Sequence, residues 1–378
     1  EFAEPQWTFG MSTWDLLPNG DIICAWTHDG LWHLGRLDRQ RGELNAFDLP
    51  FVDIASVHTQ PAANAVIFRA GSATAPGGVV RLDLGTGAWE MLRTTTEARI
   101  DPDAISIARP ISWPTPDGAT AHGFYYPPVN PRVSPPQGER PPLIVESHGG
   151  PTGATSPAFS LSTQFWTSRG FAVLDVNYGG STGYGRAYRD RLKGKWGIVD
   201  VDDCVSGAHF LAEQGLVDPE RLIIRGRSAG GYTTLAALTF RSAFRVGVSI
   251  YGVGDLEALV RDTHKFESRY LDGLVGPYPE ARATYIERSP IHHVERINSA
   301  MLLLQGLDDK VVPPNQAAMM AAAVRAKGLP VAHLEFEGEG HGFRSADTLR
   351  RALEAELAFY ARIFGFTPAD DLPPLDVE

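Results

Sequence analysis

The chain has only two cysteines among its 378 residues, and these lie far apart, at Cys24 and Cys204. Two distant cysteines cannot build a disulfide framework, and they lack the spacing of a zinc site. The chain also lacks any lysine- or arginine-rich run, and its formal net charge is −11, which argues against a nucleic-acid surface. No apolar run is long enough to span a membrane. We therefore expect no metal, no nucleic-acid partner and no membrane segment.

A signal peptide is also missing from the start of the chain. Because the chain begins with Glu1 and Phe2 rather than methionine, this absence says little about the native N-terminus. A cytoplasmic location is expected on that limited ground. The composition, 43% hydrophobic and 21% charged, is that of a globular protein, and the length suffices for two domains with sizeable cores.

Residues 1–107 read as short strands separated by turns, without a helical period. The segment RLDRQRGEL at 36–44 recurs as RLDLGTGAW at 81–89, an offset of 45 residues. Such a period is typical of propeller blades, and two hairpins with chance similarity are the alternative. Because a closed propeller needs at least about four blades, we predict two blades of an incomplete β-propeller. The tryptophans of this part are expected in its core: Trp7, Trp14, Trp26 and Trp32.

Residues 108–378 have a different pattern, in which apolar runs alternate with helical stretches. The alternation predicts a mostly parallel sheet covered by helices on both faces, with active-site residues where strands end. The predicted strands are 143–150, 171–178, 222–224, 244–252, 301–309 and 332–340. The predicted helices include 201–216, 233–240, 316–328 and 348–366.

Ser228 lies among glycines in the segment GRSAGGY, between a predicted strand and a predicted helix. With Gly226 and Gly230 it matches the pattern G-x-S-x-G, in which a sharp strand-to-helix turn exposes a nucleophilic serine. A plain glycine-rich turn with a serine helix cap is the alternative. The motif alone does not decide between these two interpretations, so a catalytic role for Ser228 requires an acid and a base elsewhere in the chain.

An acid and a histidine follow the serine in the chain order that this fold requires. Asp308 and Asp309 come just after one predicted strand, and His341 comes just after the next. A histidine can take the proton of the serine, and a carboxylate can orient the histidine. We predict the triad Ser228, Asp308 and His341, choosing Asp308 because it lies nearer the strand end.

Acyl transfer also needs hydrogen-bond donors for the oxyanion. The backbone N–H of Ala229 is one expected donor. A second is expected from Gly149 or Gly150 in the segment HGGP, or from the phenol of Tyr184. The residues leave the choice between the last two open.

These motifs together resemble the prolyl oligopeptidase family of serine peptidases, in its acylaminoacyl-peptidase-like branch. The resemblance covers about residues 110–365 and implies an α/β-hydrolase domain joined to an N-terminal β-propeller that screens substrates by size. In the family pattern the acid begins D-x-x-V, which favours Asp308, followed by Val311. The segments that carry the resemblance are HGGP (148–151), NYGGSTGYGR (177–186), GRSAGGY (226–232), SPIHHVERI (289–297), LLLQGLDDKVVPP (302–314) and EGHGF (339–343).

The substrate pocket departs from the prolyl-specific branches, because YGVGDLEALV at 251–260 has few rings. Strict specificity for proline is therefore not expected. Tyr251, Leu256 and Phe266 are candidate pocket residues, and an ordinary core role is the alternative for each. Lys310 stands where prolyl branches have a substrate-binding arginine, and it can bind a carbonyl or carboxylate only as a point charge.

The sequence thus predicts a cofactor-independent serine peptidase that acts on short peptides or acyl-peptides. A homo-oligomer is compatible with the sequence. Acylaminoacyl-peptidase-like or oligopeptidase activity is the first hypothesis. An aminopeptidase or dipeptidyl-peptidase-like activity is an alternative, and so is an esterase or amidase for small molecules, including peptide-like antibiotics. A catalytically silent binding protein is a further alternative, which an intact triad would argue against.

Overall fold

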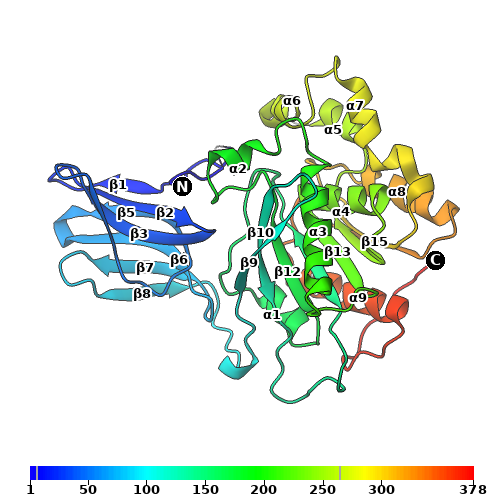
Figure 1. The fold of residues 1–378 in the computed structure, drawn as a ribbon, viewed down its shortest axis with the longest axis horizontal. Coiled ribbons are helices and arrows are strands. Elements are labelled where there is room, and N and C mark those ends of the chain that lie inside the picture. The colour runs from blue at the N-terminus through cyan, green and yellow to red at the C-terminus, as the bar shows by residue number, and fades with distance from the viewer. Residues whose placement is uncertain (6, 264) are drawn as a thin grey trace.

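The N-terminal part of the chain forms two small antiparallel sheets, which lie to one side of a larger α/β body (Figure 1). The computed structural model describes residues 1–5, 7–263 and 265–378. The first sheet holds β1 (Trp14–Leu16), β2 (Ile22–His28), β3 (Leu31–Asp38) and β4 (Glu43–Ala46) in sequence order. The second holds β5 (Asp53–Gln60), β6 (Ala65–Gly71), β7 (Gly78–Asp83) and β8 (Trp89–Thr94), also in sequence order.

The internal repeat falls on equivalent strands of the two sheets. The segment 36–44 ends β3 and begins β4, and the segment 81–89 ends β7 and begins β8. The prediction that a propeller-like part precedes the α/β body is therefore confirmed. The two sheets share one hydrophobic core: Ile23, Ala25, Leu34, Phe51, Ile54, Val57, Val66, Phe68, Ala70, Val80 and Leu82.

The four tryptophans of this part are not all placed as predicted. Only Trp32 packs against the shared core. Trp26 is half-buried and contacts the Phe2 ring, while Trp14 on β1 is exposed. Trp7 is exposed as well, and it lies outside both sheets. Aromatic type alone did not reveal which side of these short strands would be covered.

The larger body is built on one eight-stranded sheet of order β16-β15-β14-β13-β11-β12-β10-β9. Strands β11 to β16 are parallel to one another, and β10 pairs antiparallel with both β12 and β9. The predicted mostly parallel sheet is confirmed. The strands are β9 (Arg109–Pro114), β10 (Thr120–Tyr126), β11 (Leu143–Ser147), β12 (Ala172–Asn177), β13 (Leu222–Arg227), β14 (Val246–Ile250), β15 (Ala300–Gly306) and β16 (Val331–Phe336).

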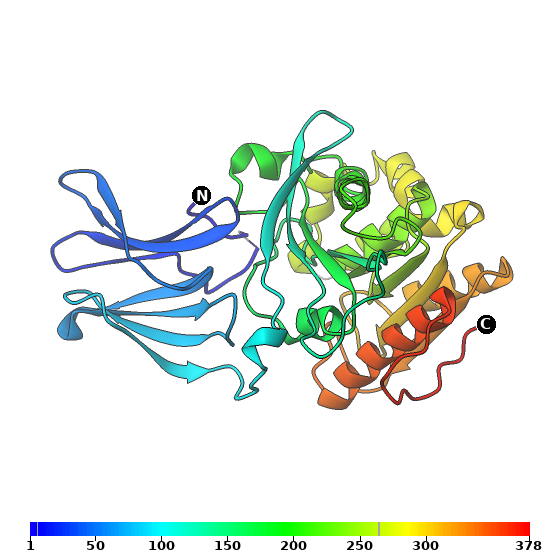
Figure 2. The ribbon, with the colours of Figure 1, turned by 60° about the horizontal axis from the view of Figure 1, so that its bottom comes forward.

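Helices cover both faces of this sheet, because successive strand residues point to opposite faces and both sets are apolar. Val145 and Ile224 join one core with α3 (Val199–Glu213), α4 (Ala229–Phe240) and α8 (Asn315–Ala326). Ile144 and Ile223 join the other core with α1 (Leu161–Thr167) and α9 (Ala346–Phe364). Figure 2 shows α9, in red, running along its face of the sheet.

Several shorter helices lie beyond the carboxyl ends of the parallel strands, with α5, α6 and α7 together at one side (Figure 1). They are α2 (Arg186–Asp190), α5 (Leu256–Asp262), α6 (Tyr270–Leu274) and α7 (Arg282–Arg288). The 3₁₀ helices are η1 (Pro61–Ala63), η2 (Pro102–Ala104), η3 (Lys265–Glu267) and η4 (Pro290–Arg296). Within the described residues, no helix combines the length and apolar character needed to cross a membrane.

Candidate active site

Ser228 forms the predicted sharp turn between β13 and α4. Its φ and ψ are 54° and −118°, a strained combination for a residue with a side chain. A Cβ added to Gly226 would lie 2.3 Å from the backbone of Gly230, and one added to Gly230 would lie 2.0 Å from the Ser147 carbonyl oxygen. Both positions therefore require glycine. Ser228 makes no side-chain cap to α4, so its hydroxyl remains available for chemistry.

Two short hydrogen bonds link Ser228 to a histidine and that histidine to a carboxylate. His341 Nε2 lies 2.8 Å from Ser228 Oγ, and His341 Nδ1 lies 2.8 Å from Asp309 Oδ2. Asp309 is buried, and its other oxygen accepts the backbone N–H groups of Val311 and Val312 at 2.8 and 2.9 Å. These bonds fix the carboxylate so that it holds His341 Nδ1–H and turns Nε2 toward the serine.

The choice of Asp308 as the acid is contradicted by this geometry. The Asp308 side chain is exposed, and its backbone N–H is bound to the Glu339 carbonyl at 2.9 Å. The chain turns immediately after β15, where the Asp309 N–H approaches the Gly306 carbonyl at 3.4 Å. Distance from the strand end was a poor guide, because the turn directs the second aspartate inward and the first outward.

The backbone of the segment at 148–150 and that of Ala229 flank the serine. Ala229 begins α4 and lines the cavity that contains Ser228. A Cβ added to Gly149 would lie 3.7 Å from the Ser228 Cβ, so this backbone passes directly beside the nucleophile. Gly150 also lines the cavity, with a φ of 59° that favours glycine.

Tyr184, the other candidate oxyanion donor, lies outside this cavity. Its ring stacks on His122 with centroids 4.3 Å apart, and its hydroxyl accepts a hydrogen bond from the Asn177 amide at 3.3 Å. Burial raises the pKa of Tyr184 to about 12. A Cβ on Gly30 would meet its hydroxyl at 2.3 Å, so the phenol is packed against the first N-terminal sheet. Of the two alternatives, the geometry favours the glycines.

His148 holds the start of this glycine segment. Its Nε2 lies 2.8 Å from Ser181 Oγ, and its ring stacks on Tyr178 at 4.3 Å between centroids. Burial lowers the pKa of His148 to about 4, so the ring is neutral at pH 7. A neutral, packed histidine supports the loop without adding charge beside the site.

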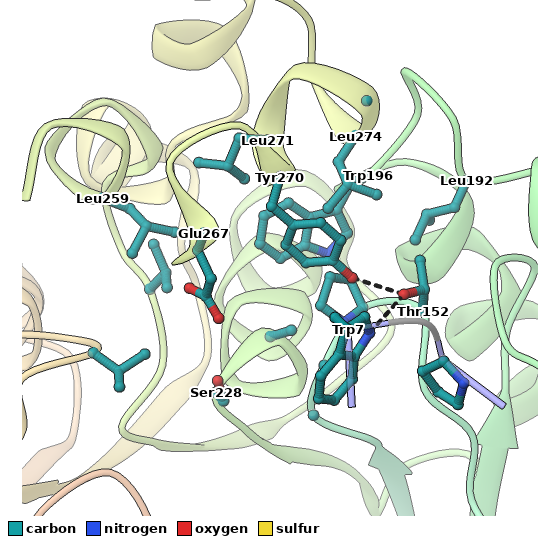
Figure 3. A pocket seen from close by; sticks show the side chains of 18 of the residues that line it. Trp7, Thr152, Leu192, Trp196, Ser228, Leu259, Glu267, Tyr270, Leu271 and Leu274 are labelled. Atoms are coloured by element: carbon teal, nitrogen blue, oxygen red, sulfur yellow. Dashed lines mark hydrogen bonds between the residues drawn. The ribbon is translucent and has the colours of Figure 1, made fainter. Parts of the chain in front are cut away.

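A cavity of about 1100 Å³ opens above Ser228 (Figure 3). Much of its wall is apolar or aromatic and comes from the segments around α5 and α6. The apolar lining includes Trp7, Leu192, Trp196, Tyr251, Val253, Leu259, Phe266, Tyr270, Leu271, Leu274, Val311 and Val312. The charged lining residues are Arg186, Arg189, Asp190, Lys193, Arg227 and Glu267.

The predicted pocket residues divide into two that line the cavity and two that do not. Tyr251 and Phe266 line it, and the Tyr251 ring lies 4.9 Å from the His341 ring. Leu256 is fully buried, because as the first residue of α5 it faces the core beneath the cavity. Lys310 is exposed and absent from the lining, because it follows the inward-facing Asp309 at the turn. The structure thus gives no support to a substrate-binding role for Leu256 or Lys310.

Sequence reasoning missed Glu267 and Trp7. In Figure 3 Glu267 lies above Ser228, and its carboxylate points into the cavity in the direction of the serine. Glu267 ends η3 and accepts a hydrogen bond from the Thr263 hydroxyl at 3.3 Å. Neither residue belongs to a motif, so no local signal in the sequence pointed to them. Only the folded positions of η3 and of the segment before β1 show that both side chains line the cavity.

A buried charge cluster lies under the serine on the α9 side of the sheet. Arg227 Nη1 lies 3.1 Å from Glu146 Oε1, and Arg225 bridges Glu146 and Glu356 at 2.8 Å each. Asp175 stands beside Glu146 in the parallel register. Burial, with the neighbouring Glu146 charge, raises the pKa of Asp175 to about 8. Asp175 is thus largely protonated at neutral pH and adds little negative charge to the cluster.

No group of three or more metal-ligating side chains occurs in the described ranges 1–5, 7–263 and 265–378. The chemistry that the site can perform with its own groups is nucleophilic attack by a serine, with a histidine as base and N–H donors nearby.

The chain is similar to several known proteins. A family model described as "Prolyl oligopeptidase family" matches residues 157–367. A solved structure of a Mycobacterium tuberculosis puromycin-hydrolyzing peptidase is 43% identical with a TM-score of 0.96, and the match covers 100% of this chain and 57% of that one.

Two curated relatives are more distant. Dipeptidyl aminopeptidase BIII of Pseudoxanthomonas mexicana is 31% identical over 230 residues, which are 59% of this chain and 33% of the relative. The acylamino-acid-releasing enzyme of Arabidopsis thaliana is 30% identical over 215 residues, which are 54% and 28% of the two chains. The matched region thus spans a third or less of these relatives.

Proposed function

The chain belongs to the prolyl oligopeptidase family of serine peptidases, and from that premise we propose that it releases an apolar N-terminal residue with a free amino group from short peptides and small amides. The carrying observation is the Glu267 carboxylate in the apolar cavity above Ser228 (Figure 3). A carboxylate there favours a substrate ammonium group, because opposite charges attract strongly where water is partly excluded. The 43% identical neighbour is described as hydrolysing puromycin, which is itself an amide of an aromatic amino acid with a free amine.

In the proposed reaction Ser228 Oγ attacks the carbonyl carbon of the scissile amide while His341 Nε2 takes its proton. The Asp309 carboxylate holds the imidazole and stabilises its positive charge. The N–H groups of Ala229 and of the Gly149–Gly150 segment bind the developing oxyanion. His341 then gives its proton to the leaving amine, which departs as the C–N bond breaks and an acyl-enzyme remains. Water, activated by His341, hydrolyses that ester and frees Ser228.

The side chain of the released residue would lie against the apolar wall. Trp196, Leu271 and Leu274 contribute to this wall in Figure 3, and Leu271 and Leu274 lie on the short helix α6. Burying a leucine- or phenylalanine-sized side chain there contributes about 1.5–3 kcal/mol to binding. Large apolar first residues should therefore be preferred over small or charged ones.

A second candidate is release of N-acylated residues. It is favoured by the same apolar wall, which could take an acyl group, and by the similarity to the acylamino-acid-releasing enzyme of Arabidopsis thaliana. The two candidates differ in what lies beside Glu267: an ammonium group in the first and a neutral amide in the second.

The deciding experiment compares leucine p-nitroanilide with its N-acetyl derivative. We expect kcat/KM to be at least about 10-fold higher for the free amine, since an ammonium–carboxylate contact is worth about 1.5–3 kcal/mol. Glu267→Gln should remove most of that preference while leaving hydrolysis of the acetylated substrate little changed. Thr263→Val, which removes only the hydroxyl bound to Glu267, is the matched control. A higher kcat/KM for the acetylated substrate would overturn the first candidate and support the second.

A further inference from the structure

Trp7 reaches the site from a distant part of the chain. It precedes the first N-terminal sheet in sequence, yet it lines the cavity together with Ser228 and Gly150. The residue counts as exposed at 38% of its surface, but the rest of that surface is covered by protein. Figure 3 shows it beside Ser228, across the cavity from Glu267.

The indole ring packs directly on the glycine segment proposed to bind the oxyanion. A Cβ added to Gly150 would lie 2.5 Å from Trp7 Cζ2 and 2.8 Å from Trp7 Cη2. The ring therefore occupies the space over this glycine and limits the movement of its backbone. The turn that follows is held by a backbone hydrogen bond, in which the Gly153 N–H donates to the Gly150 carbonyl at 2.7 Å.

A chain of hydrogen bonds joins Trp7 to the opposite wall. Trp7 Nε1 donates to Thr152 Oγ1 at 3.0 Å, and Thr152 Oγ1 lies 2.7 Å from the Tyr270 hydroxyl (Figure 3). Burial raises the pKa of Tyr270, so its hydroxyl keeps its proton at neutral pH. Three segments far apart in sequence thus meet at Thr152, two residues after Gly150.

The N-terminal segment is itself anchored on both sides of Trp7. The Thr13 hydroxyl donates to the Phe2 carbonyl at 2.9 Å, and the Phe2 ring lies 6.0 Å from the Trp26 ring on β2. On the far side the Phe9 and Phe266 rings lie 5.2 Å apart. The segment therefore connects the first sheet to the cavity wall and holds Trp7 between them.

We propose that Trp7 is a positioning residue for the oxyanion-binding segment: through Gly150 and Thr152 it fixes the backbone N–H groups at 149–150 relative to Ser228. This inference rests on the proposed function and deepens it, because it makes the N-terminal segment part of the active site. A donor held before the reaction needs no reorganisation in the transition state, whereas one that moves by about 1 Å can cost up to about 100-fold in rate.

The test uses kcat and KM for leucine p-nitroanilide in matched variants of the full chain. Trp7→Ala and Thr152→Val should each lower kcat about 10-fold or more, with a much smaller change in KM. Trp7→Phe, which keeps a ring over Gly150 but loses the Nε1 donor, should be intermediate, and Thr152→Ser should be close to wild type. Trp14→Ala, an exposed tryptophan that does not line the cavity, controls for loss of an indole in this part.

A second readout separates positioning from a merely structural role. Leucinal, an aldehyde that forms a tetrahedral adduct with the serine, should lose affinity for each variant by the same factor as kcat/KM falls. If Trp7→Ala changes only KM, or lowers thermal stability without weakening leucinal binding, the proposal is overturned.

Failure of the proposed function would look different. If the wild type hydrolyses neither anilide, the aminopeptidase assignment falls. The positioning role is then decided by the rate at which a fluorophosphonate labels Ser228, which also depends on the oxyanion donors. Slower labelling of Trp7→Ala than of wild type and of Trp14→Ala would support the proposal, and equal rates would contradict it.

Discussion

In the two N-terminal sheets each strand pairs antiparallel with its neighbour in sequence, whereas the six parallel strands of the large sheet bring loops from distant parts of the chain to one edge. The first arrangement produces a local core around Phe68 and no catalytic group. The second places Ser228, Asp309 and His341, each just after a different strand, within hydrogen-bond reach. Stability and chemistry are therefore largely separable in this molecule, except at the N-terminal segment that carries Trp7.

The largest expected effect comes from removing the nucleophile in the large sheet. Ser228→Ala should lower kcat about 10⁶-fold, because the base then has no hydroxyl to activate. Thermal stability should stay close to wild type, since Ser228 makes no side-chain cap to α4. Steady-state hydrolysis of leucine p-nitroanilide and a melting curve check both halves of this prediction. Turnover within about 10-fold of wild type would contradict the assignment of Ser228.

The neighbouring aspartates give a sharper test within one turn. Asp309→Asn should lower kcat about 10⁴-fold, because an amide cannot hold the imidazole in the required tautomer and stabilise its charge. Asp308→Asn is the matched control, and its exposed side chain predicts a change of less than about 2-fold. The reverse order of effects would restore Asp308 as the acid.

A core substitution in the N-terminal sheets should have the opposite signature. Phe68→Ala removes a fully buried ring from the shared core and should cost about 3–5 kcal/mol in the free energy of unfolding of this part. The kcat of the folded protein should change little, because Phe68 does not line the cavity. Urea denaturation and kinetics below the transition measure the two effects, with exposed Leu92→Ala on β8 as the control. A large fall in kcat would show that the two regions are not separable.

Stability should also depend on pH, through Asp175. Burial raises its pKa to about 8, against about 3.9 in the unfolded chain. Its contribution to stability is therefore fully present below about pH 4 and is lost as pH rises through 8, by at most about 1.4 kcal/mol per pH unit. Asp175→Asn cannot ionise, so the free energy of unfolding of wild type should fall relative to this variant between pH 5 and 8.

The control for that prediction is Asp370, whose pKa is lowered by its hydrogen bonds to Arg169. Because Asp370 is ionised in both states above pH 5, Asp370→Asn should differ from wild type by a constant amount across the same range. Denaturation curves at pH 5, 6.5 and 8 compare the three proteins. A difference in the free energy of unfolding between wild type and Asp175→Asn that stays constant over this range would mean that Asp175 is ionised in the fold, and would contradict the prediction.

The sequence predicted the six parallel strands and the helices α3, α4, α8 and α9 of the large body, because apolar runs and turn residues act locally. It did not reveal β9 and β10. Ser228 and His341 were also predictable, since glycines and strand ends mark both positions. The choice between Asp308 and Asp309 failed because D-x-x-V fits from either aspartate, ending at Val311 or at Val312, and only the turn after β15 decides which side chain faces His341. Trp7 was missed for a different reason: its contact with Gly150 joins residues 143 positions apart, and only the packing of the two regions brings them together.

The central claim is that Ser228, His341 and Asp309 act as one nucleophilic unit. Its most direct test is the rate of fluorophosphonate labelling, followed by intact mass and peptide mapping, for wild type, Asp308→Asn and Asp309→Asn. We expect one adduct, located on Ser228, formed at similar rates in wild type and Asp308→Asn and far more slowly in Asp309→Asn. An adduct on another residue, or equal labelling of Asp309→Asn and wild type, would contradict it.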